Sequence, residues 1–204
     1  MKERPILFNG EMVRAILDGR KTQTRRPVKP QPVFVNSLGI PFFAMGGGPV
    51  DYRNAPLGTI GDRLWVRETW GLMSYHDTTY WCGYSIKDVS EAELREQFLV
   101  EHAANWNLPN ESAYWRPSIH MPRWASRITL EITGVRVERV QEISDDDAES
   151  EGVDLRRMCG CVEGCATCDD RSPSEVFRDL WQSIYTNWDA NPWVWVYSIK
   201  LIKL

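Results

Sequence analysis

A chain of 204 residues that is 43% hydrophobic and 25% charged is long enough for one domain with a packed core. No stretch approaches about 18 unbroken apolar residues, and the apolar run at 6–8 is too short for a secretory signal, so we expect a cytosolic protein without a membrane span. The net charge of −4 excludes the class of proteins that bind long duplex DNA through its phosphates.

The charges are unevenly distributed along the chain. Residues 14–29 contain six basic residues and one acidic residue, whereas residues 142–154 contain seven acidic residues and no basic one. A basic segment facing an acidic one favours a small binding site over a long track. Two separate solvated surfaces are the alternative interpretation.

The first half of the chain is predicted to hold a strand, a helix and a long insertion. A short strand at 6–8 leads into a helix that Asn9 caps and that Gly19 ends in the left-handed conformation. Residues 30–60 are rich in proline and glycine, which predicts an extended loop insertion. Alternating residues at 63–70 and an apolar run at 80–84 predict two further strands.

The second half is predicted to mix helices with long strands. We expect a helix over 90–103, a strand over 127–140 with a bulge at Gly134, a short helix after Ser144, and a helix after Ser172 whose buried face includes Ile184. The last strand, over 193–202, is apolar on both faces and therefore central in its sheet. These elements predict an α+β fold, a small β-barrel decorated by helices, in a single domain over 1–204.

The segment 17–26 resembles the ASCH family, whose Gly-x-Lys motif is followed by an acid or a threonine and then by an arginine. Gly19, Lys21, Thr24 and Arg26 occupy those places. The segments 61–62 and 144–153 also look like ASCH proteins, and the ordered set 12–17, 65–70, 117–127 and 191–195 is similar to ASCH proteins of tailed phages and prophages. The resemblance covers nearly the whole chain. It implies a PUA-like fold, with insertions around 30–60, 85–122 and a Cys-rich loop at 155–172, and a role near RNA or modified nucleosides.

The resemblance also implies a set of catalytic residues. One compact branch of the family, the N4-acetylcytidine amidohydrolases, uses a lysine and a threonine of the motif together with a glutamate from a later helix. Lys21 and Thr24 match the first two, and Glu151 best matches the third. This chain is much longer than the members of that branch, so its insertions can reshape the pocket.

Amide hydrolysis places definite demands on these side chains. Thr24 is a weak nucleophile that needs a base beside it, and Lys21 is a base only when neutral. Burial and the neighbouring arginines would lower the pKa of Lys21, while Glu151 would orient it or accept a proton. Arg26, with Arg20, would bind a phosphate or a carbonyl oxygen. The alternative is an ordinary surface patch in which Thr24 is only a strand residue.

Two residues of the predicted strand at 63–70 are further ligand-binding candidates. Glu68 would point into the barrel, although an exposed carboxylate paired with Arg67 or Arg63 is the alternative. Trp65 would stack on a base near the basic segment, although large aromatic residues also fill small cores.

Four clustered cysteines, Cys159, Cys161, Cys165 and Cys168, have the number and type of ligands that a structural zinc site needs. Reduced thiols in a loop are the alternative. We expect no organic cofactor, and nothing in the sequence predicts an oligomeric state.

Two functions remain open. The first is a binding module that holds a modified nucleoside or short RNA in a pocket around Lys21. The second is an amidohydrolase that removes an acyl group from a cytidine-type nucleoside. A buried site that joins Lys21, Thr24 and Glu151 would favour the enzyme, whereas a shallow basic groove with Glu151 distant would favour the binding module.

Overall fold

The computed structural model describes residues 1–37, 39–42, 55–74, 90, 92, 94, 98–105, 115–153 and 171–203. These residues form an α+β fold around a five-stranded sheet. In spatial order its strands are β1 (Glu3–Leu7), β5 (Arg63–Arg67), β8 (Thr129–Arg139), β9 (Trp193–Lys203) and β2 (Gln23–Pro27). The pair β1–β5 is parallel and the other pairs are antiparallel. The final strand, β9, lies between β8 and β2, which confirms the predicted central position.

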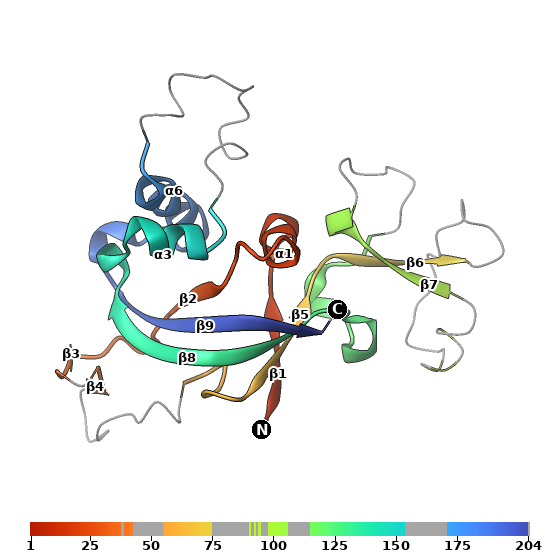
Figure 1. Cartoon of the computed structure of the whole chain (residues 1–204), viewed down its shortest axis with the longest axis horizontal. Coiled ribbons are helices and arrows are strands. Elements are labelled where there is room, and N and C mark those ends of the chain that lie inside the picture. The colour runs from red at the N-terminus through yellow and green to blue at the C-terminus, as the bar shows by residue number, and fades with distance from the viewer. Residues whose placement is uncertain are drawn as a thin grey trace.

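The sheet is strongly curved but is not closed within the described residues. Strands β8 and β9 bend together along the molecule (Figure 1), and their register shifts between Ile132 and Gly134, where the sequence predicted a bulge. The edge strands β1 and β2 share no ladder in the described part of the chain. A side chain connects them, because Arg26 Nη2 of β2 donates to the backbone carbonyl of Leu7 of β1 at 3.3 Å.

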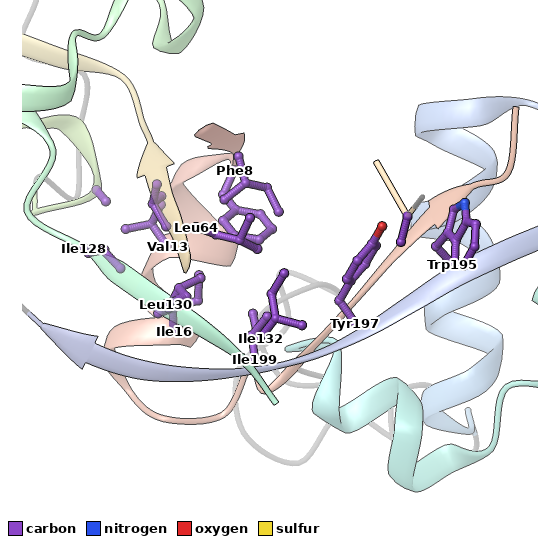
Figure 2. Close-up of a cluster of buried hydrophobic side chains, with 14 of the residues drawn as sticks. Phe8, Val13, Ile16, Leu64, Ile128, Leu130, Ile132, Trp195, Tyr197 and Ile199 are labelled. Carbon is purple, nitrogen blue, oxygen red and sulfur yellow. The ribbon is translucent and has the colours of Figure 1, made fainter. Parts of the chain in front are cut away.

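One face of the sheet carries the main hydrophobic core. Helix α1 (Gly10–Leu17) lies on this face and contributes Val13 and Ile16. Figure 2 shows their side chains among those of the strands, including Leu64 and Tyr197. Asn9 caps the helix as predicted, because its Oδ1 accepts from the backbone N–H of Met12 at 2.8 Å.

The other face of β9 packs against the two later helices. Helices α3 (Asp145–Ser150) and α6 (Pro173–Tyr185) lie together beyond this face (Figure 1). Val194 and Val196 are buried there with Trp181. The side chain of Ser144 caps α3, and Ser172 forms a capping box with Glu175, so both predicted helix starts are confirmed.

The remaining elements include departures from the predictions. Residues 98–102, which were predicted to be helical, form strand β7 (Phe98–His102) and pair with β6 (Trp70–Ser74). This prediction was wrong because pairing with β6 outweighs the local helical pattern. Ile184 was predicted to be buried in α6 but is 50% exposed. The predicted strand at 80–84 lies outside the described residues.

Short ribbons and 3₁₀ turns complete the described structure. In the insertion at 30–60, two short strands pair as a ribbon, and elsewhere single 3₁₀ turns join the larger elements. In chain order, the ribbon strands and then the turns are β3 (Phe34–Val35), β4 (Pro41–Phe42), η3 (Ala103–Asn105), η4 (Ser118–His120), η5 (Arg123–Ala125), η6 (Val140–Glu142) and η7 (Trp188–Ala190). None of the helices described is both long and apolar enough to span a membrane.

Two glycines with positive φ end the helices that meet at Lys21, and they allow a matched stability test. Gly152 has φ +86° and a Cβ there would lie 2.9 Å from Ala15 Cβ and 3.0 Å from Lys21 Cβ, whereas Gly19 has φ +74° and open space. We expect Gly19→Ala to lower the free energy of unfolding by about 1 kcal/mol, from backbone strain alone. Gly152→Ala adds overpacking and should cost roughly 2–4 kcal/mol. Urea denaturation of both variants would measure this, and equal losses would contradict the close packing.

Candidate functional site

Lys21 lies in the short connection between α1 and β2. The backbone N–H groups of Arg20 and Lys21 both donate to the carbonyl of Ala15 at 2.9 Å, which folds the chain tightly against the end of α1. The next residue, Thr22, donates its N–H to the carbonyl of Ser150 at 2.8 Å and so ties this connection to the end of α3. Lys21 is therefore held between the C-terminal ends of two helices, and it is only 3% exposed.

The ammonium of Lys21 donates to three acceptors. Nζ lies 2.8 Å from Glu151 Oε2, 2.7 Å from the backbone carbonyl of Glu151 and 2.8 Å from the carbonyl of Gln23. An ammonium has three N–H groups, so all of them are used. Glu151 is the C-cap residue of α3, where free carbonyls need a donor, and Lys21 supplies it. The predicted contact of Lys21 with the glutamate of the later helix is thus present and buried.

Burial and charge act in opposite directions on the pKa of Lys21. Desolvation is the largest effect and lowers the pKa, and Glu151 opposes it by its charge and its hydrogen bond. Arg26 and Arg25 lower the pKa further, and the net change is downward from the usual lysine value. The neutral amine is therefore easier to reach here than on a solvated lysine.

Thr24 lies next to this pair, on the side of β2 that faces the main core. It pairs with Tyr197 of β9 and its side chain is completely buried. Its Oγ1 accepts from Arg26 Nη1 at 2.9 Å, and within the described residues its hydroxyl donates to no acceptor. The guanidinium carbon of Arg26 and the Nζ of Lys21 each lie 5.5 Å from the centroid of the Phe8 ring. Lys21 and Arg26, the partner of Thr24, therefore both lie over the Phe8 ring.

Arg25 is a member of the site that the sequence reasoning did not select. Its guanidinium is 1% exposed and donates from Nη1 to Glu151 Oε1 at 3.1 Å. It also donates to Glu138 Oε1 at 2.6 and 3.1 Å and to Asp147 Oδ2 at 2.8 Å. The alternation of β2 places Arg25 on the face opposite Thr24, toward the acidic helix α3. The acidic run at 142–154 was the available signal for this contact.

Arg20 lies at the edge of the site. It donates to Asp18 at 3.0 Å and to the carbonyl of Gly152 at 3.5 Å, so it borders the loop that holds Lys21.

Glu68 belongs to a different buried cluster. Both of its carboxylate oxygens accept from Arg127, at 3.0 and 3.1 Å, so its partner is neither Arg67 nor Arg63. His102 Nε2 lies 4.0 Å from Glu68 Oε1, but burial lowers the pKa of His102 and favours the neutral ring. Among the described residues, the polar contacts of Glu68 do not include the Lys21 site, so its assignment as a ligand-binding residue gains no support.

Trp65 is 8% exposed and is covered by two guanidinium groups. Those of Arg67 and Arg123 lie 4.7 and 5.8 Å from its ring. The described contacts of Trp65 do not reach Lys21, Thr24 or Glu151. The four cysteines proposed as zinc ligands lie outside the described residues, and the part of the chain that is described contains no metal-binding group of His, Cys, Asp or Glu. The zinc site stays a prediction.

The buried pair can be tested by its effect on stability. Lys21→Met or Glu151→Gln breaks a buried, hydrogen-bonded ion pair by removing one of its members, which should lower the free energy of unfolding by about 3–5 kcal/mol. The double variant should lose less than the sum of the two. Glu3→Gln is the control, because Glu3 and Arg123 form a pair with side chains 39% and 42% exposed, and its loss should stay within about 1 kcal/mol. Additive losses in urea denaturation would show that the two groups do not interact.

No protein-family model, curated protein or solved structure matches this chain.

Proposed function

We propose that this chain is an ASCH-type protein with a PUA-like fold that hydrolyses the amide bond of an acylated pyrimidine nucleoside. The observation that carries this proposal is the buried 2.8 Å contact of Lys21 with Glu151, beside the Thr24–Arg26 pair. Lys21, Thr24 and Glu151 are the residues that the family resemblance assigns to catalysis, and they come from segments more than 120 residues apart. The curved sheet, whose two edge strands are connected by the Arg26 side chain, supports the barrel-like architecture.

Thr24 is the nucleophile in this proposal. Its oxygen attacks the acyl carbon, and the hydroxyl proton passes to the neutral amine of Lys21. A neutral amine has only two N–H groups, so one of the three contacts of Lys21 is given up and its lone pair becomes available. The lowered pKa of Lys21 makes this state accessible. Glu151 then stabilises the ammonium that forms.

The second half of the reaction returns the proton and releases the acyl group. Lys21 gives its proton to the leaving nitrogen as the C–N bond breaks, which leaves an ester on Thr24. Water then attacks this ester with Lys21 as the base, and the carboxylic acid departs while Thr24 regains its hydrogen. The net reaction consumes one water and yields the free amine and the acid.

Arg26 stabilises the oxygen on which negative charge develops. Three hydrogen bonds to Thr24, Arg25 and Leu7 use three of the five N–H groups of its guanidinium within the described structure. The remaining two can donate to the oxyanion of a tetrahedral intermediate. The cation also lies 2.9 Å from Thr24 Oγ1, where it would stabilise an alkoxide.

A second candidate is a binding module for a modified nucleoside or short RNA. This function is favoured because the polar groups of the site already have partners. Every N–H of Lys21 has an acceptor, and Thr24 Oγ1 accepts a hydrogen bond from the Arg26 cation. A site of this kind can recognise a ligand through Arg26 and the Phe8 ring without turning it over.

Incubation with N4-acetylcytidine and related acylated nucleosides distinguishes the two functions. We expect cytidine and acetate to form, and Thr24→Ala to slow turnover by at least ~10³-fold because the nucleophile is lost. Thr22→Ala is the matched control, since Thr22 is exposed and only two residues away. Binding without turnover of any acylated nucleoside would establish the binding module. The absence of both binding and turnover would refute both functions.

A further inference from the structure

The carboxylate of Glu151 is held from both sides by cations. Lys21 Nζ lies 2.8 Å from Oε2, and Arg25 Nη1 lies 3.1 Å from Oε1. The terminal torsion of a glutamate is broad, so a single partner would leave the carboxylate free to rotate. Two donors on different oxygens remove this freedom and keep Oε2 directed at Lys21.

Arg25 is itself firmly fixed. Its backbone pairs with Val196 of β9, and its guanidinium lies 5.8 Å from the ring of Phe177. Glu138 of β8 and Asp147 of α3 bind the same guanidinium. This makes Arg25 a rigid support that joins β2, β8 and the α3 helix behind the proposed catalytic pair.

A second arginine, Arg136, forms ion pairs with Glu138 and Asp147 but, among the described contacts, none with Glu151. It donates to Glu138 Oε2 at 2.8 Å and to Asp147 Oδ2 at 2.6 Å, and its side chain is 40% exposed. Arg136 and Arg25 therefore carry the same charge and share two partners. They differ in the contact with Glu151, which makes Arg136 a natural control.

Charged groups from three directions surround the Lys21–Glu151 pair. They are Arg20, Arg25 and Arg26 around β2, Glu138 and Arg136 on β8, and Asp147 on α3. Burial tends to raise the pKa of Asp147, but a hydrogen bond from Gln23 and the charges of Arg136 and Arg25 lower it, so this carboxylate stays ionised near neutral pH. Of these cations, Arg25 bonds directly to the carboxylate of Glu151.

We propose that Arg25 is a positioning residue, which orients Glu151 toward Lys21 and weakens proton binding by Lys21. The proposal rests on the proposed function for its catalytic meaning, but its structural part does not need turnover. In this proposal Arg25 contacts none of the reacting atoms. Its charge lies near the Lys21 amine, so its removal should strengthen proton binding by Lys21 and raise the pKa of that amine.

The test compares Arg25→Gln with Arg136→Gln. The pKa of Lys21 is measured by ¹³C NMR of its ε carbon, assigned by the signal that Lys21→Met lacks. We expect Arg25→Gln to raise this pKa by about one unit and Arg136→Gln to change it far less. The pH profile of kcat/KM with N4-acetylcytidine should move upward by the same amount in Arg25→Gln alone. Equal shifts in the two variants, or none, would overturn the proposal.

Arg25→Lys separates charge from geometry and covers the case in which Arg25→Gln does not fold. A lysine keeps the positive charge, but its compact ammonium lacks the planar fork of donors with which Arg25 reaches three separate carboxylates. We expect the pKa of Lys21 to stay near that of the wild type, while kcat falls at least tenfold and KM changes little. Unchanged kcat would overturn the positioning role. If the wild type shows no turnover, the proposed function fails, and the NMR comparison still decides whether Arg25 controls the pair.

Discussion

The folding of this chain around Lys21 depends on an ammonium that is removed from water. A buried lysine is tolerated only when its donors are satisfied and its charge is paired. Here the C-terminal turn of α3 supplies both conditions, through the carbonyl and the carboxylate of Glu151. The segment that follows α1 must therefore meet the end of α3, and the bond from Thr22 to Ser150 holds the two together. Gly152, which follows α3, packs so closely against Lys21 that a Cβ there would lie 3.0 Å from Lys21 Cβ.

The alternation of β2 divides the site between the two sides of the sheet. Thr24 and Arg26 face the main core and the Phe8 ring, whereas Arg25 faces the acids of α3 and β8. Lys21, which precedes the strand, reaches both groups of residues. Such an arrangement separates the proposed nucleophile and oxyanion donor on one side from the support of the carboxylate on the other. The strand between them keeps the spacing of these parts fixed.

Local signals in the sequence were enough to predict much of this structure. Asn9, Ser144 and Ser172 cap helices because each offers an oxygen to a free N–H, an interaction within four residues. The meeting of Lys21 with Glu151 came from the family motif. Strand β7 was missed because its stability comes from pairing with β6. Arg25 was missed because its three carboxylates lie more than 110 residues away, where only the acidic run hinted at them.

The charges of the site must be considered as a set. Ion pairs connect three cations and three carboxylates, namely Lys21, Arg25 and Arg136 with Glu138, Asp147 and Glu151. The set is neutral when every member is ionised, so a proton lost from Lys21 leaves one negative charge in a buried region. That charge favours the return of a proton to Lys21. A proton taken from Thr24 would restore neutrality, which is the direction that nucleophile activation requires.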